Sequence, residues 1–150
     1  MAYTFVRNAV QLVFSTKHRR PIILDFIKNE LHNYLGGICN QLDCQAIQVG
    51  GYSDHVHVLC LLSKKIALMK LAQELKSRSS GWMKTNGDVF QDFYWQEGYG
   101  AFSVHHSNLD NVSLYISNQH IHHQSVSFQD EFRAFLIEHN ITADERYLWQ

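Results

Sequence analysis

The 150-residue chain has one proline, only three cysteines and no long apolar run. A membrane-spanning helix needs roughly 18 or more apolar residues in succession, so the sequence predicts no transmembrane segment. The cysteines are odd in number and form no CxxC pair, which favours free thiols in a reducing compartment. The beginning of the sequence also lacks the apolar stretch of a signal peptide. Together these absences predict a cytoplasmic protein.

Charge is also scarce: 18% of the residues are charged and the net charge is -1. The basic residues nevertheless gather in residues 1–24 and 63–84, whereas acidic residues dominate from Glu97 onward. Because the distribution of charge matters more than its sum, a net charge near zero does not exclude a nucleic-acid partner. Ordinary solvated helix faces are the alternative interpretation. The basic residues that are candidates for DNA contact are Arg19, Arg20, Lys70, Lys76 and Arg78.

The length and the 45% hydrophobic content suit one domain over residues 1–150. Apolar periodicity predicts strands near 10–16, 46–50, 55–62 and 102–104, and helices over 27–42 and 66–83. The resulting order βαββαβ predicts an α+β fold of the ferredoxin-like (RRM-like) type, an antiparallel sheet with two helices on one face. Capping-box patterns at residues 107–110 and 127–130 predict two further, C-terminal helices, the first carrying a tyrosine.

The most informative motif is His55-Val56-His57, which lies within one of the expected strands. Successive side chains of a strand point to opposite faces, so the two imidazoles share one face and Val56 points into a core. Tyr115 and Gln119 are four residues apart and therefore share a face of the expected helix. If the two faces dock, the imidazoles and the amide oxygen could hold a divalent cation beside a phenol. Packed or hydrogen-bonded histidines are the alternative for such a pair.

This combination of groups predicts cleavage of a phosphodiester. A phenol with a pKa near 10 is a poor nucleophile at neutral pH, so Tyr115 would need a phosphate polarised by a cation. The product would be a phosphotyrosyl enzyme that conserves the bond energy for rejoining. The sequence has no nucleophile-elbow pattern that would favour a serine or cysteine nucleophile. The remaining histidines around the tyrosine are interpreted as polar surface at element ends: His105, His106, His120, His122 and His123.

Three segments of the chain resemble the HUH-type single-tyrosine transposases, which belong to insertion sequences that move as single-stranded DNA. The similarity begins near residues 12–17 (LVFSTK) and extends to residues 147–149 (YLW), nearly the whole chain. Each motif alone is moderately specific, whereas all of them in this order are highly specific. The segments are Tyr52–Leu59 (YSDHVHVL), Trp95–Val104 (WQEGYGAFSV) and Tyr115–Gln119 (YISNQ).

The resemblance implies a transposase with a metal-dependent tyrosine nucleophile. It assigns His55, His57 and Gln119 as ligands of Mg or Mn and Tyr115 as the nucleophile. The implied substrate is single-stranded DNA with hairpins at the ends of the mobile element. The implied assembly is a homodimer in which the tyrosine helix of one subunit completes the metal site of the other, that is, in trans.

Other functions remain open at the level of sequence. A domesticated relative could bind or nick chromosomal repeat hairpins rather than move an element. A nucleic-acid-binding module without catalysis is a further alternative, although the central strands lack the aromatic signature of RNA-binding sheets. A histidine-triad hydrolase would need a third histidine at position 59, where the chain has Leu59.

Overall fold

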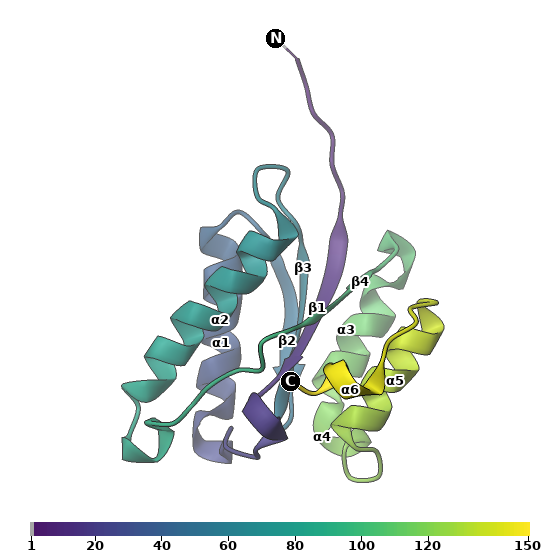
Figure 1. Ribbon diagram of the computed structural model, residues 1–150. Coiled ribbons are helices and arrows are strands. Elements are labelled where there is room, and N and C mark those ends of the chain that lie inside the picture. The colour runs from purple at the N-terminus through teal and green to yellow at the C-terminus, as the bar shows by residue number, and fades with distance from the viewer. Residues whose placement is uncertain (1) are drawn as a thin grey trace.

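The computed structural model describes residues 2–150 (Figure 1). Its centre is a four-stranded antiparallel sheet with the strand order β2-β3-β1-β4. The central strands β1 (Ala9–Ser15) and β3 (His55–Leu61) pair along their whole length, while β2 (Ala46–Gly51) and β4 (Gly100–Ser103) form the edges. This order and connectivity confirm the predicted ferredoxin-like α+β fold.

The helices α1 (Asp25–Gln41) and α2 (Leu68–Lys84) cover one face of the sheet (Figure 1). Their apolar residues recur at helical spacing, so each helix turns one stripe toward the strands. The core between them includes Phe14 and Val56 from the sheet and Leu35 and Leu75 from the helices, all fully buried. Burial of each such side chain contributes roughly 1.5–3 kcal/mol, which holds this layer together.

The C-terminal helices cover the opposite face of the sheet (Figure 1). They are α3 (Leu109–Ser117), α4 (Gln119–His122), α5 (Phe128–Glu138) and the short α6 (Glu145–Leu148). Phe128 and Phe132 of α5 pack with Phe102 of β4 in a second apolar cluster. The sequence left open whether this face is exposed or covered, and the structure shows that it is covered.

One of the two predicted caps is confirmed and the other is wrong. The Ser127 hydroxyl accepts a hydrogen bond from the backbone N–H of Asp130 at 3.1 Å and so caps α5. By contrast, Ser107 lies inside the 3-10 turn η3 (His106–Asn108), and α3 begins only at Leu109. The Ser107 backbone N–H is accepted by the His105 ring at 3.2 Å, so the histidine acts as the cap of η3.

The tyrosine helix is divided into two pieces. α3 ends at Ser117 and α4 begins at Gln119, with Asn118 between them at φ -100° and ψ 17°. The helical turn nevertheless continues through the break, because the backbone N–H of Asn118 donates to the carbonyl of Leu114 at 3.1 Å. Tyr115 and Gln119 therefore stand on two adjoining short helices rather than on one continuous helix.

Two short 3-10 turns connect the remaining elements, η1 (Lys17–Arg19) after β1 and η2 (Asp88–Phe90) after α2. The three cysteines are buried free thiols, as the sequence predicted. Across residues 2–150, none of the helices combines the length and the apolar character needed to cross a bilayer.

Candidate active site

His55 and His57 lie side by side on β3, on the sheet face that α3, α4 and α5 cover. Both side chains are fully buried, and their ring centroids are 5.1 Å apart. Val56 and Val58 point the other way and pack in the core under α1 and α2. The strand period predicted this division, and the structure confirms it.

Each imidazole is held by an oxygen behind it. Nδ1 of His55 is 2.7 Å from a carboxylate oxygen of Asp54, and Nδ1 of His57 is 2.8 Å from Oε1 of Gln11. Because these oxygens only accept hydrogen bonds, each Nδ1 carries the hydrogen and donates it. The Nε2 atoms of both rings therefore face the interior of the site, in the orientation that histidine ligands of metals adopt.

The Nε2 atoms meet oxygen acceptors. Oε1 of Gln119 is 2.9 Å from Nε2 of His55, and Oε1 of Glu131 is 3.0 Å from Nε2 of His57. The lone pair of each Nε2 atom faces an oxygen that also carries lone pairs. The two atoms repel each other unless a proton or a cation lies between them. Imidazole nitrogen, carboxylate and amide oxygen are all established ligands of divalent cations. The residues therefore fit a metal ion, with His55, His57, Gln119 and Glu131 as the groups that could hold it.

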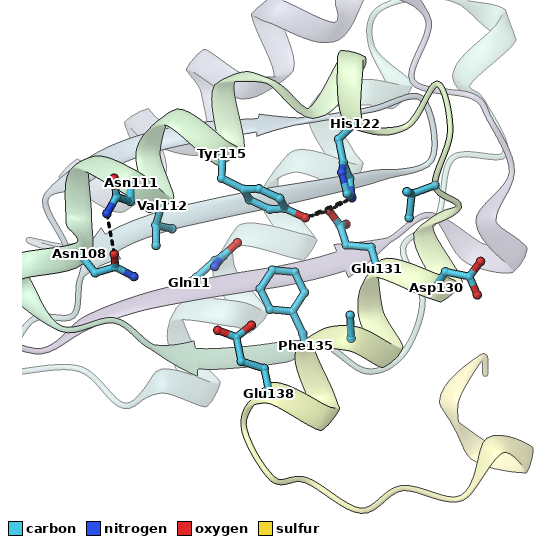
Figure 2. A pocket seen from close by; sticks show the side chains of 12 residues that line it. Gln11, Asn108, Asn111, Val112, Tyr115, His122, Asp130, Glu131, Phe135 and Glu138 are labelled. Carbon is cyan, nitrogen blue, oxygen red and sulfur yellow. Dashed lines mark hydrogen bonds and ion pairs between the residues drawn. The ribbon is translucent and has the colours of Figure 1, made fainter.

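Tyr115 reaches the same cluster from α3 within one chain (Figure 2). Its ring centroid lies 6.0 Å from that of His57, and its hydroxyl donates a hydrogen bond to Oε2 of Glu131. Nε2 of His122 is 3.4 Å from the same hydroxyl. Burial, followed by the contact with the Glu131 carboxylate, raises the pKa of the Tyr115 phenol. The phenol is therefore protonated in this arrangement.

Glu131 is the residue of this cluster that sequence reasoning missed. It lies in the first turn of α5 and is only 3% exposed. Burial by itself raises its pKa, but hydrogen bonds with His123 and His57 outweigh burial and hold the pKa well below its usual range. The carboxylate is thus ionised. One signal could have found it: Glu131 interrupts the apolar stripe of α5 between Phe128 and Phe132.

A cavity of about 350 Å³ lies beside Tyr115, between α3 and α5 (Figure 2). Its wall includes Gln11 from β1 and Phe135 from α5, with Asn111 and Glu138 farther along. The hydroxyl of Tyr115 is therefore accessible from this side, although the imidazoles behind it are buried.

The basic candidates on α2 do not join this cluster, because α2 covers the opposite face of the sheet (Figure 1). Lys70 and Arg78 form ion pairs with Glu74 at 3.0 and 2.7 Å. The Lys76 ammonium donates to the backbone carbonyls of residues 96–98 at 2.6–3.1 Å, so it anchors that loop. A role for these residues in DNA binding stays a prediction.

The two arginines of the η1 region are arranged differently. Arg19 donates to the backbone carbonyl of Trp149 at 3.0 Å and lies over its ring at 5.5 Å. Arg20 is exposed. Arg19 therefore ties the C-terminus to the end of β1, while Arg20 is available to a partner, and DNA contact by either residue stays a prediction.

Comparison with known proteins gives a family for most of the chain. Residues 4–119 match the family model described as Transposase IS200 like. A crystal structure of a Deinococcus radiodurans R1 protein assigned as a transposase is similar, with a TM-score of 0.61 and 20% identity over 79% of this chain and 96% of that one. A REP-associated tyrosine transposase bound to a REP hairpin has a TM-score of 0.59 and 12% identity over 84% and 74% of the two chains. No curated protein matches the sequence.

Proposed function

Because the chain belongs to the IS200-like transposases, we propose that it cuts and rejoins single-stranded DNA at hairpin-marked element ends through a covalent 5′-phosphotyrosine on Tyr115. The observation that carries this proposal is the cluster in which the Tyr115 phenol, two buried imidazoles and the Glu131 carboxylate meet. Among the aromatic ring pairs of residues 2–150, Tyr115 is the only tyrosine that pairs with His57.

The reaction would exchange one phosphodiester for another. The Tyr115 oxygen attacks the scissile phosphorus, the new P–O bond forms, and the bond from phosphorus to the 3′ oxygen breaks. The Glu131 carboxylate accepts the hydrogen bond of the phenol and so positions its oxygen. The phenol proton leaves to water as the P–O bond forms, and the departing 3′ oxygen takes a proton from water. Attack by a 3′-hydroxyl on the phosphotyrosine reverses the sequence and rejoins the strand.

His55, His57 and Gln119 would hold the divalent cation, Mg or Mn, that this chemistry needs. A bound cation would polarise the phosphate and favour the leaving group. The imidazoles are suited to this task because Asp54 and Gln11 fix their orientation before any ion arrives.

The proposed partner is a folded single strand. The proposed assembly is a homodimer in which each chain uses its own tyrosine rather than that of its partner, because Tyr115 lies beside His57 within one chain. The similar REP-associated transposase is bound to a REP hairpin, which supports a hairpin as the ligand of this fold. The same likeness favours a second candidate function, binding or nicking of chromosomal repeat hairpins by a domesticated relative. The two candidates share one active site and differ in the DNA that they process.

The test is a denaturation-resistant complex between the protein and labelled single-stranded DNA. Hairpins from mobile-element ends and from chromosomal repeats are incubated separately with the protein and Mg²⁺ or Mn²⁺. We expect a covalent adduct with the native protein and none with Tyr115→Phe. The exposed Tyr147 provides the matched control, Tyr147→Phe, which should form the adduct normally. An adduct that persists in Tyr115→Phe would refute the mechanism.

Alanine at either histidine separates chemistry from binding. His55→Ala and His57→Ala should abolish cleavage and leave hairpin affinity unchanged. Loss of cleavage and binding together would instead indicate that the histidines stabilise the fold.

A further inference from the structure

The cavity beside Tyr115 is bounded by one face of each of two helices (Figure 2). Asn111 and Tyr115 are four residues apart on α3, and Phe135 and Glu138 are three apart on α5, so each pair shares a helix face. Gln11 of β1 closes the cavity toward the sheet. The volume of about 350 Å³ lies within the range of small-ligand pockets, roughly 300–1,000 Å³. The cavity is therefore large enough for a planar ring system such as a nucleobase.

Gln11 points to a ligand that carries hydrogen-bond acceptors. The residue is only 3% exposed and forms part of the cavity wall. Its Oε1 accepts a hydrogen bond from Nδ1 of His57 at 2.8 Å, which fixes the amide and leaves Nε2 as its free end. Among the described residues, no acceptor lies within hydrogen-bond distance of this Nε2. A buried N–H group without a partner costs free energy, so a ligand that accepts from it is favoured here.

The cavity wall carries negative charge. Its carboxylates belong to Asp130, Glu131 and Glu138, and none of the lysines and arginines that the structure describes forms part of the wall. Asp130 pairs with Arg133 at 3.1 Å, and Glu131 accepts the hydrogen bond of the Tyr115 hydroxyl. Glu138 is exposed and has no ion-pair partner within residues 2–150. The wall therefore repels a phosphate and offers an open acceptor to N–H groups.

The rest of the wall suits a flat aromatic ligand. The ring of Phe135 is held against Phe102 of β4, with centroids 5.1 Å apart and planes 15° apart. The Asn111 amide donates to Oδ1 of Asn108 at 3.0 Å, so the two amides hold each other and both keep N–H groups to donate. Proteins bind unpaired bases by stacking on aromatic rings and by hydrogen bonds to the base edges. The cavity has both kinds of group.

We propose that this cavity binds one nucleobase next to the scissile phosphate and selects guanine. The inference deepens the proposed function, on which it rests for the strand that supplies the base. The Watson–Crick edge of guanine carries two adjacent donors, N1–H and N2–H, beside the acceptor O6. The Glu138 carboxylate would accept both donors, while the amide of Asn108 or Asn111 donates to O6.

The other bases fit Glu138 less well. Adenine and cytosine each present an amino group beside a ring nitrogen with a lone pair, which a carboxylate repels. Thymine presents a single N–H between two carbonyl oxygens. Each of these bases leaves hydrogen bonds of the Glu138 carboxylate unmade, so each should bind more weakly than guanine.

Tyr115 links the base to the reaction. Its ring forms part of the cavity wall, whereas its hydroxyl points toward Glu131 (Figure 2). Glu138 lies two turns farther along α5 than Glu131, roughly 10 Å away along the helix axis. A phosphate attacked by the hydroxyl therefore stays at the Glu131 end, and the base of its nucleotide lies beside the cavity.

Binding of short single strands tests the proposal without cleavage. Tyr115→Phe, which keeps the ring but lacks the nucleophile, is titrated in MgCl₂ with fluorescein-labelled pentathymidylate and with strands that carry guanine, adenine or cytosine at the central position. We expect the guanine strand to bind at least about tenfold more tightly than the others, as for a two-hydrogen-bond base contact. Inosine, which is guanine without its 2-amino group, should lose most of this preference. Equal affinity for all strands would overturn the inference.

Glu138→Gln in the same background tests the assigned residue. An amide has only one acceptor atom, so the guanine preference should disappear while the affinity for pentathymidylate stays unchanged. The exposed Glu30 on α1 gives the matched control Glu30→Gln, which should keep the preference. A guanine preference that survives in Glu138→Gln would contradict the role of this carboxylate.

The native protein separates this inference from the proposed function. Element-end hairpins randomised at the two nucleotides that flank the cleavage site are incubated with the protein, and the DNA of the covalent adducts is sequenced. Guanine should be enriched at one of the two positions. Adducts without any base enrichment would overturn this inference and leave the proposed function standing. Guanine-selective binding without an adduct would refute the proposed function and leave this inference standing.

Discussion

The carbonyl oxygen of Ile116 lies so near Gly50 that a Cβ on Gly50 would be 2.5 Å from it. Gly50 belongs to β2 and Ile116 follows Tyr115, the proposed nucleophile, on α3, so this contact sets how closely the tyrosine helix approaches the sheet. Only glycine allows the approach, because any other side chain would meet backbone rather than a flexible atom.

Gly50→Ala should therefore displace α3 and reduce adduct formation. We expect a loss of about 1–3 kcal/mol in the free energy of unfolding, as for other overpacked sites, together with a larger than tenfold fall in the cleavage rate. Gly37 is the matched control, since it lies within α1 and has no atom within 4 Å of an added Cβ. Gly37→Ala should stabilise the protein by roughly 0.5–1 kcal/mol and preserve cleavage. Urea unfolding and single-turnover cleavage measure both quantities, and equal cleavage in the two variants would contradict the argument.

Asp54 should strengthen metal binding indirectly, through its hydrogen bond with His55, without being a ligand of the ion itself. Its carboxylate accepts from Nδ1 of His55 and fixes the ring orientation. Removal of such a supporting group typically weakens metal binding by roughly 10–100-fold. Asp54→Ala should weaken Mn²⁺ binding by about this factor in a calorimetric titration, while the exposed Asp88→Ala should not change it. Unchanged affinity in Asp54→Ala would mean that packing alone orients His55.

His32 should make the fold sensitive to acid. Burial, followed by repulsion from Lys28, lowers the pKa of His32 to about 4, and its Nε2 has no partner among the described residues. The unfolded chain takes up a proton below about pH 6.5, whereas the folded chain does so only near 4. The neutral His32 ring therefore contributes its full share to the free energy of unfolding above pH 6.5. This contribution is lost as the pH falls from 6.5 toward 4, because the unfolded chain takes up the proton first.

At pH 5 this difference amounts to about 2 kcal/mol of unfolding free energy. His32→Leu should remove it, so the variant should lose less stability than the native protein between pH 7.5 and pH 5. Urea unfolding with EDTA present, which keeps metal from the other histidines, gives the comparison. The same loss in both proteins would show that His32 is not the source.

Mixing two variants that are each expected to be inactive tests whether a site uses the tyrosine of its own chain. Within one chain, Tyr115 already lies beside His57, and the close contact at Gly50 holds its helix on its own sheet. We therefore expect that Tyr115→Phe mixed with His57→Ala forms no adduct, because each chain uses its own tyrosine. Recovery of about a quarter to a half of the native activity in the mixture would instead demonstrate sites completed in trans. Each variant alone and the native protein are the controls.

Local patterns predicted the elements and the faces of their residues. The two-residue period of a strand placed His55 and His57 together and Val56 in the core, since each side chain's face depends only on its neighbours in the strand. The division of the tyrosine helix at Asn118 was not predicted, because a short polar segment gives no strong signal against continuing the helix.

The sequence by itself determined the strand faces, the spacing of Tyr115 and Gln119, and the family likeness that names a chemistry. Only the tertiary structure decided that Glu131, 74 residues away from His57, supplies the carboxylate between the imidazoles and the phenol. The same packing buried His123, which its polar neighbours made to look exposed. The physical reason is that periodicity reports contacts within one element, whereas the docking of α5 depends on apolar side chains of two other elements, Val13 of β1 and Phe102 of β4.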